Sequence, residues 1–497
     1  MDSNATSSLT LSIQRDGIDS PGSSVFDLPI HNSTQALQTS NADTLASLRP
    51  PVPHHHELTS LNSDSFVLIS GGTGGNAICT AFPDACYVLP VSDDGGSSSE
   101  IIRVLGGPSV GDIRSRLVRL IPPAPASSPL NAIRTLFAYR LPHYYSERQA
   151  REEWRDIIEG RSPLWNGIPT DRKETIRACN GLLNMFPGFL VYFESEILRR
   201  AHKNFTFVNG SIGNYFIAAA QGFFRSLPSA IFLFSSITNS QANILPVIVT
   251  NHTVTIAAEM EDGERIVGQC DISHPVATAQ APTINVVDEW SPSDDSKGQA
   301  TNVLFGAQSK DQYEPLSSRI SRLLYINAYG IEIHPSPNPD YLLSLRTSTL
   351  LVYSCGSLWT SIMPCLALQG VASAIARSGS LQAKILLLNS KNDRETAGYT
   401  AVDYIQAIAR TLNTQYQHQP YGLGNAQTMY PISAFITDII YLRGGAVVVD
   451  VDRITALGVR CTEVDPEEDD ESNGDPKLSA NIVRRAVNGI VARFSDF

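Results

Sequence analysis

The chain has 497 residues, and its 49 acidic and 37 basic side chains give a formal net charge of −12 at pH 7. This balance disfavours nucleic acid as a partner, because binding along a phosphate backbone needs a concentrated positive surface. The seven cysteines form no Cys-x-x-Cys pair, and no apolar run reaches the ~18 residues of a membrane span. These features argue against a zinc site, a disulfide framework and a membrane partner, and they predict a soluble, cytoplasmic protein.

The first strong pattern is an apolar run of strand length, residues 66–69, that leads into a glycine-rich segment and then into helix-compatible residues 77–81. Glycine lets backbone N–H groups approach an anion closely, and the first amides of a helix have no intrahelical partners. We therefore predict a phosphate cradle made by Gly71, Gly72, Thr73 and Gly74. A tight turn without a ligand would give the same pattern, because neither the Walker sequence nor the dinucleotide spacing is present.

A second apolar run, residues 87–91, ends in a loop that carries the adjacent carboxylates Asp93 and Asp94 and the hydroxyl of Ser97. Consecutive strand ends lie at one edge of an open parallel sheet, so this loop and the glycine loop should face one pocket. The carboxylate pair by itself is more typical of a plain turn than of a binding site, since Asp-Asp-Gly-Gly is favourable turn chemistry. Only the conjunction of the two loops favours a binding site.

Gly111 and Asp112 precede a predicted helix, residues 113–121, whose apolar residues share one face. Asp112 has the ordinary chemistry of a helix N-cap. Arg114, Arg116 and Arg119 are expected to lie off the apolar stripe. Arg114 falls in the first turn, where acidic residues are preferred, and this conflict indicates an anionic ligand or a carboxylate partner.

Further strands are predicted wherever apolar residues alternate or run together: 205–208, 230–233, 247–250, 253–259, 265–270, 322–325, 350–353 and 383–388. The strand at 205–208 should deliver Ser211, Gly213 and Asn214 to the start of another helix. The strands at 247–250 and 253–259 should form a hairpin. Helices are expected at 363–376, 400–412 and 480–494.

These motifs, in their order along the chain, resemble those of the 2-phospho-L-lactate transferase family, which also contains the bacterial gluconeogenesis factors. The matching segments are 71–74, 92–98, 111–114, 211–214, 245–247 with 258–263, 355–362 and 395–400. Two positions depart from the usual pattern, because Ser70 replaces a glycine and Asn209-Gly210 stand where many members have Gly-His.

The pattern and the resemblance together predict an α/β fold, doubly wound, with a mainly parallel, Rossmann-like sheet and helices on both faces. Residues 63–462 should form one nucleotide-binding α/β domain with a charged cap insertion at 143–175 and a loop insertion at 288–316. The flanking segments are expected to be a disordered tail at 1–62, an acidic linker at 463–478 and a C-terminal helix at 479–497. The loops of Gly71, Asp93, Gly213 and Gly356 should lie along one edge.

The resemblance implies a nucleoside diphosphate or nucleotide-sugar ligand. It assigns catalysis to Asp93, Asp94 and Arg114, with Asp94 as a ligand of Mg²⁺. It assigns nucleotide or phosphate binding to Gly71, Gly72, Thr73, Gly74, Ser97, Gly111, Asp112, Ser211, Gly213, Asn214, Gly356 and Ser357.

Two functions fit this cradle equally well, and a homodimer is left open. One is transfer of a phosphate-bearing group from a nucleotide-activated donor, as in a 2-phospho-L-lactate transferase. The other is a non-catalytic, UDP-sugar-binding regulator of carbon metabolism or of the cell envelope.

Overall fold

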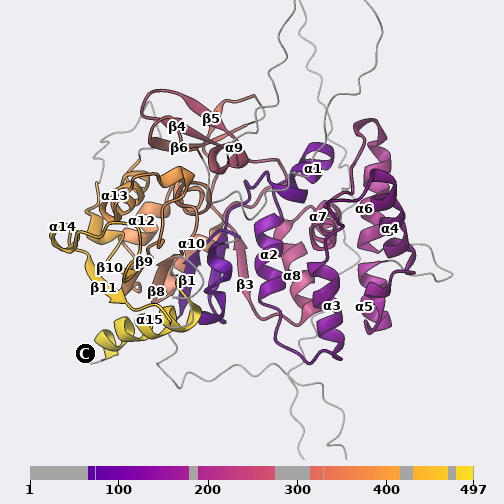
Figure 1. The fold of residues 1–497 in the computed structure, drawn as a ribbon, viewed down its shortest axis with the longest axis horizontal. Coiled ribbons are helices and arrows are strands. Elements are labelled where there is room, and N and C mark those ends of the chain that lie inside the picture. Colours follow the sequence, from indigo (N-terminus) through magenta and orange to yellow (C-terminus); the bar gives the residue numbers. More distant parts are fainter. Residues whose placement is uncertain are drawn as a thin grey trace, which may run out of the picture. The chain divides into compact units, whose positions relative to one another are not determined.

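The computed structural model describes residues 65–72, 74–177, 188–274, 314–327, 329–414, 429–467 and 477–495. The predicted tail at 1–62, most of the loop insertion at 288–316, and the core of the acidic linker lie outside these ranges. The described strands form a seven-stranded and a four-stranded sheet (Figure 1). The larger sheet contains β1 (Phe66–Ile69), β2 (Cys86–Leu89), β3 (Asn243–Pro246), β8 (Leu350–Tyr353), β9 (Ala383–Leu387), β10 (Asp438–Leu442) and β11 (Arg460–Val464).

The larger sheet has the order β11-β10-β9-β8-β1-β2-β3, and every neighbouring pair is parallel. The chain starts at β1, moves outward through β2 and β3, and then returns to the other side of β1 at β8. The strand order therefore reverses between β1 and β8, which is where ligands bind in doubly wound sheets. This topology confirms the predicted fold class.

The helices are numbered in chain order. They are α1 (Gly96–Leu105), α2 (Gly111–Arg119), α3 (Pro129–Ala138), α4 (Glu147–Glu159), α5 (Thr170–Ile176), α6 (Phe189–Arg199), α7 (Ile212–Phe224), α8 (Leu227–Thr238), α9 (Gln269–Ser273), α10 (Pro339–Thr347), α11 (Met363–Leu366), α12 (Val371–Ala376), α13 (Ala401–Leu412), α14 (Val451–Ala456) and α15 (Ala480–Ser495). None of the helices in the described ranges is long and apolar enough to cross a membrane.

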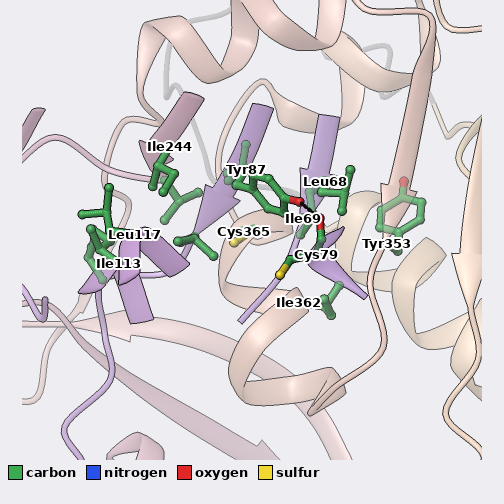
Figure 2. Packing of buried hydrophobic residues seen from close by; sticks show 14 of the residues in the cluster. Leu68, Ile69, Cys79, Tyr87, Ile113, Leu117, Ile244, Tyr353, Ile362 and Cys365 are labelled. Carbon is green, nitrogen blue, oxygen red and sulfur yellow. Dashed lines mark hydrogen bonds between the residues drawn. The ribbon is translucent and has the colours of Figure 1, made fainter. Parts of the chain in front are cut away.

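Both faces of the larger sheet are covered, because β2, β8 and β9 bury every residue along their length. On one face, Ile113 and Leu117 of α2 lie beside Ile244 of β3 (Figure 2). Tyr353 of β8 donates its hydroxyl to the carbonyl oxygen of Phe435 over 2.9 Å. The continuous apolar runs that predicted these strands are thus the signature of a sheet buried on two sides.

The four-stranded sheet is antiparallel, and it corrects a predicted hairpin. It has the order β5-β4-β6-β7, made of β4 (Thr255–Met260), β5 (Arg265–Val267), β6 (Ile320–Ile326) and β7 (Glu332–Ile333). The predicted strands at 247–250 and 253–259 do not pair, because β3 ends at Pro246 within the parallel sheet and β4 belongs to this second sheet. Turn-like residues between two apolar runs mark a change of sheet here.

Two other strand predictions are wrong. Residues 230–233 lie inside α8, where Ser226 caps the helix by accepting the N–H of Ser229 and a proline occupies the first turn. A short apolar run cannot separate a buried helix from a strand, and the cap was the decisive signal. Residues 205–208 form no strand. Phe205 and Phe207 are buried there because they pack against Tyr215, and Phe207 also stacks on Trp154.

The predicted helix at 363–376 is interrupted. It consists of α11 and α12, separated by Gly370, whose φ of 90° lies in the left-handed region. A π-helical turn, η6 (Leu358–Ile362), precedes α11. The charged segment at 143–175 contains α4 and α5, and α4 buries Trp154 and Ile157 on its inner face.

Candidate functional site

The segment after β1 does not form the expected α-helix. It contains two short 3-10 turns, η1 (Gly74–Asn76) and η2 (Cys79–Ala81). The prediction of a helix N-terminus behind the glycine loop is therefore wrong, and no helix dipole supports an anion at this loop. Thr73 lies outside the described residues.

The glycines of this loop are required by close packing. A Cβ atom would lie 2.2 Å from Ser361 Oγ at Gly71, 2.1 Å from Asp112 Oδ1 at Gly72, and 2.5 Å from the Cα of Gly356 at Gly74. The backbone N–H of Gly72 donates to the Asp112 carboxylate. Any side chain here would push the loop away from the β8 loop and from α2, which meet it at the topological switch.

Arg116 of α2 holds the glycine loop in place. It is fully buried, it donates Nη1 to Gly75 O over 2.8 Å, and it donates Nη2 to Ser70 Oγ and Gly71 O over 2.8 and 3.0 Å. Its guanidinium carbon lies 4.8 Å from the ring centroid of Tyr87. The expectation that Arg116 lies off the apolar face is wrong. Position 116 is three residues after Ile113, so the helical spacing places it on the buried face.

The loop after β2 places Asp93 and Asp94 beneath α9. Asp93 Oδ1 accepts the N–H of Gly95 over 3.0 Å and the Nε2–H of Gln269 over 3.2 Å. Asp94 Oδ1 accepts the N–H of Cys270 over 2.8 Å. Since α9 follows β5, the smaller sheet supplies a wall of the carboxylate site. No motif marked Gln269 or Cys270, which lie about 175 residues downstream.

Two of the carboxylates of this site have raised pKa values. Burial, and next the nearby charges of Asp112 and Asp94, raise the pKa of Asp93 to about 8, while the Gly95 N–H and Arg140 oppose the shift. Burial also raises the pKa of Asp112 to about 6, against the charge of Arg116 and the Gly72 N–H. In the ligand-free protein, Asp93 therefore carries a proton at neutral pH for most of the time.

Asp112 is not the N-cap of α2. The N-cap residue is Val110, without a side-chain cap, and Asp112 lies in the first turn. Its carboxylate accepts the N–H of Gly72 instead, so it joins the glycine loop to the carboxylate pair. Gly111 completes this contact, because a Cβ there would lie 2.7 Å from both Asp93 Oδ2 and Ser98 Oγ.

The first turns of α1, α2 and α7 meet at Asn214. Its Nδ2 donates to Ser97 Oγ over 2.7 Å, and its Oδ1 accepts from Arg114 Nε over 3.1 Å. A Cβ at Gly213 would lie 2.5 Å from the carbonyl oxygen of Phe137, so glycine is needed for this approach. Although Gly213 does not follow a strand, α7 reaches the same site as the Asp93 loop. The N-termini of three helices, each the positive end of a helix dipole, thus face one region.

Arg140 is a site residue that the sequence did not reveal. It follows α3 and forms an antiparallel bridge with Ser211, and its Nη1 donates to Asn209 O over 2.6 Å. Burial, and next the charge of Arg140, lower the pKa of Arg114 to about 10. Burial also lowers the pKa of Arg140. Neither arginine has a carboxylate within ion-pair distance in the described ranges.

Two serine hydroxyls at this junction have unused hydrogen-bonding capacity. Ser98 Oγ and Ser211 Oγ are buried, and neither has a hydrogen-bond partner among the residues that the structure describes. Buried hydroxyls are normally paired, so such atoms mark a position where a further polar group fits. Together with Arg114, Arg140 and Asn214, they offer donors to an anion.

The β8 loop lies on the other side of the glycine loop. Gly356 exchanges two hydrogen bonds with the side-chain amide of Asn389, over 2.9 and 2.8 Å. The Glu395 carboxylate accepts the backbone N–H groups of Trp359 and Thr360 and the Thr360 hydroxyl. Burial, and next the charge of Asp393, raise the pKa of Glu395 to about 8. These contacts fix the loop that carries Gly356 and Ser357.

The structure thus groups the predicted residues in two adjoining places. Gly74 lies against Gly356, Gly71 against Ser361 and Gly72 against Asp112. Arg114, Ser97 and Asn214 lie around the first turns of α1, α2 and α7. The family model described as 2-phospho-L-lactate transferase CofD matches residues 66–465. The chain belongs to the CofD family.

Relatives of this CofD-family protein span its length. An uncharacterized protein of Saccharomyces cerevisiae is 33% identical over 439 residues, covering 80% of this chain and 94% of the relative. A gluconeogenesis factor of Halalkalibacterium halodurans is 23% identical over 408 residues, covering 80% and 88%. A crystal structure of a UPF0052 family member from Bacillus halodurans superimposes with a TM-score of 0.53 at 19% identity, covering 85% and 99%. This last likeness supports the fold.

A magnesium ion at this site would need some of its ligands from the substrate. No group of three or more His, Cys, Asp or Glu side chains in the described ranges could hold a metal ion. The adjacent carboxylates Asp93 and Asp94 suit an ion that takes its other ligands from phosphate oxygens and water. The residues of this CofD-family site therefore fit substrate-bound magnesium better than a metal site made by the protein alone.

Proposed function

We propose that this protein binds a nucleoside diphosphate ligand and transfers a phosphate-bearing group from a nucleotide-activated donor to an acceptor hydroxyl. The observation that carries the proposal is the pair Arg114 and Arg140. Both arginines are half-buried, and they lie near enough for Arg140 to lower the pKa of Arg114, yet no described carboxylate forms an ion pair with them. Two such cations are stabilised by a doubly charged anion, and diphosphate is one.

The surrounding donors extend this anion site. Asn214, Ser97, Ser98 and Ser211 supply uncharged donors at the ends of α1 and α7. The glycine loop, which contacts Asp112, would hold the neighbouring part of the same ligand. A ligand with two linked phosphates can bridge these places, whereas a monophosphate can occupy only one of them.

Asp93 is suited to accept the proton of the acceptor. In the transfer, the acceptor oxygen forms a bond to phosphorus while the bond from phosphorus to the leaving nucleotide oxygen breaks. The acceptor proton passes to the ionised form of Asp93, whose pKa of about 8 is near the working range of a general base. Arg114 and Arg140 then stabilise the negative charge that develops on the phosphate oxygens.

We propose Asp94 as the residue that would hold magnesium. The ion would neutralise phosphate charge when bound with the donor. The remaining oxygen of Asp94 is available for this, since Oδ1 accepts the N–H of Cys270. The predicted homodimer and cytoplasmic location are not tested by the described residues and stay predictions.

A UDP-sugar-binding regulator is the alternative. The relative named gluconeogenesis factor, whose match covers 80% of this chain, favours it. Such a protein would use the same arginines and helix ends to bind the ligand, without a need for the proton transfer at Asp93. Turnover of a bound nucleotide-activated donor, measured by phosphorus NMR, separates transfer from binding alone.

Arg140→Gln tests the binding proposal, and Arg151→Gln is its matched control. Both arginines donate to a backbone carbonyl oxygen, Arg140 to Asn209 and Arg151 to Phe205, over 2.6 Å in each case. We expect GDP or a UDP-sugar to raise the melting temperature of the wild type and of Arg151→Gln, but not of Arg140→Gln. Equal ligand-induced shifts in all three proteins would overturn the assignment of Arg140.

A further inference from the structure

A cavity of about 820 Å³ opens along α2, and Arg114 of the proposed diphosphate site is part of its wall. Pro83 and Asp84 in its wall precede β2, and Gln241 and Ala242 precede β3. These residues lie at the amino ends of parallel strands, whereas the loops of the proposed diphosphate site follow the carboxyl ends. The cavity thus reaches the other edge of the sheet, although Asn76 and Arg114 also line it, and its volume lies within the roughly 300–1,000 Å³ that is typical of small-molecule sites.

The wall of this cavity is positively charged, whereas the chain as a whole carries a net negative charge. Its wall contains one acidic residue, Asp84, and four arginines: Arg114, Arg119, Arg134 and Arg484. In the described part of the chain, none of the four forms an ion pair with a carboxylate. This concentration of unpaired positive charge in a protein of net charge −12 is complementary to an anion.

Backbone carbonyl groups hold two of these arginines at the wall. Arg134 Nη2 donates to the carbonyl oxygens of Ile121 and Pro122, over 2.6 Å in both cases. Arg484 of α15 donates to the carbonyl oxygen of Thr80. These bonds restrict the guanidinium groups and leave their full charges uncompensated. Arg119 makes no hydrogen bond within the described residues.

The rest of the wall is mainly apolar. Its apolar members are Pro83, Val118, Leu120, Ile121, Pro122, Pro123, Ala138 and Ala242. A small inorganic anion would leave this apolar surface in contact with water. A neutral apolar molecule would leave the positive charges of the arginines without a negative partner. The wall therefore matches a molecule with both an anionic group and an apolar body.

We propose that this cavity is a second ligand site, for an organic anion whose carboxylate, phosphate or sulfonate is attached to an apolar ring or chain. The anionic group pairs with Arg119 and Arg484 at the open side, and the apolar body lies against Val118 and Pro122. Arg140 is not in the wall, so this site and the proposed diphosphate site can be separated by substitution.

The probe is anilinonaphthalene sulfonate, an aromatic anion that fluoresces when it enters an apolar site. Its uncharged counterpart, phenylnaphthylamine, is the matched probe without the anionic group. We expect saturable binding of one sulfonate molecule to the folded protein, and binding of the uncharged probe that is weaker by about tenfold or more. Equal affinity for the two probes would overturn anion recognition.

The variant Arg119→Gln/Arg484→Gln should weaken sulfonate binding by about tenfold. Its control, Arg346→Gln/Arg410→Gln, removes the same charge from exposed positions on α10 and α13 and should leave binding within about twofold. Val118→Trp fills the cavity without changing charge and should abolish binding, while thermal unfolding verifies that each variant folds. Equal binding by wild type and both arginine variants would contradict the proposal.

Arg140→Gln distinguishes the two sites. It should retain the sulfonate affinity of the wild type even where it loses binding of GDP. Loss of sulfonate binding in Arg140→Gln, with retention in Arg119→Gln/Arg484→Gln, would place the probe in the diphosphate site and overturn the second site. Failure of the diphosphate proposal alone would leave the sulfonate result unchanged.

Discussion

The side-chain amide of Asn214 donates to the hydroxyl of Ser97 over 2.7 Å, joining the first turn of α7 to the first turn of α1 across 117 residues of sequence. The same Asn214 accepts from Arg114 of α2. One amide therefore orients a hydroxyl and a guanidinium group toward the region where three helices begin. This chain of contacts is central to the proposed anion site.

Asn214→Ala should lower ligand affinity more than it lowers stability. It frees Ser97 and Arg114 to rotate, and loss of a hydrogen bond to a charged group costs ~1.5–3 kcal/mol, or about ten- to 150-fold in affinity. Calorimetric titration with GDP or a UDP-sugar measures this. Asn131→Ala is the control, because Asn131 is a half-buried residue of α3 whose amide donates, among the described residues, only to the carbonyl oxygen of Ala126. Wild-type affinity in Asn214→Ala would show that this contact does not serve the ligand.

Asp94→Asn should keep the fold and lose the magnesium dependence of ligand binding. Asparagine retains an oxygen that can accept the N–H of Cys270, so the contact with α9 survives. The negative charge that magnesium needs is removed. Titrations with and without magnesium, on both proteins, check this. If magnesium changes affinity in neither protein, the metal role of Asp94 is refuted.

The ligand-free protein should lose stability as pH rises toward 8, partly because of Asp93. Its folded pKa of about 8 lies above the ordinary aspartate pKa of 3.8, so its protonated form is favoured in the folded state. The corresponding stabilisation is complete below pH 4 and is lost as pH rises to about 8, at no more than ~1.4 kcal/mol per pH unit.

Asp93→Asn isolates that contribution. Urea unfolding from pH 5 to pH 8 should show the free energy of unfolding of the wild type falling relative to that of Asp93→Asn. Asp112 and Glu395, whose pKa values are also raised, titrate in both proteins and cancel in the comparison to the extent that they are independent of Asp93. Parallel pH profiles for the two proteins would contradict the raised pKa.

Arg116→Met should destabilise the fold by ~2–4 kcal/mol. It leaves the acceptors Ser70, Gly71 and Gly75 without their buried donor, although the chain volume is nearly kept. Arg119→Gln, at an exposed position of the same helix, should change stability by no more than ~0.5 kcal/mol. Denaturant unfolding compares them, and equal stability of the two variants would show that Arg116 does not brace the loop.

The fold could be predicted from the sequence wherever a local hydrophobic pattern is compatible with only one kind of secondary structure. The runs at 66–69 and 350–353 are continuously apolar, and the run at 383–388 is apolar except at Lys384, because β1, β8 and β9 are buried on both faces. The run at 230–233 has the same appearance but belongs to α8, because its partners are other helices. Local hydrophobicity does not specify the kind of partner.

The site residues in the motif-bearing loops could be predicted from the sequence. The residues that tertiary pairing brings to the site could not. Asp93, Asp112 and Asn214 belong to recognisable motifs, but Arg140 reaches them only through its bridge with Ser211, and Gln269 only through the smaller sheet. Such residues are placed by tertiary pairing, which leaves no spacing signal in the sequence. Arg116 is different, because the prediction that placed it off the apolar stripe is wrong although its position three residues after Ile113 corresponds to the buried face.

The central claim is that the junction of α1, α2 and α7, with the glycine loop, binds a diphosphate. Thermal-shift titration of the wild-type protein with GDP, GMP, UMP and UDP-sugars tests it most directly, because only ligands that bind the native state raise the melting temperature. We predict that a diphosphate-containing ligand raises it, and that the corresponding monophosphate binds at least ~tenfold more weakly. If no diphosphate raises the melting temperature at millimolar concentration, the diphosphate site does not exist in this protein.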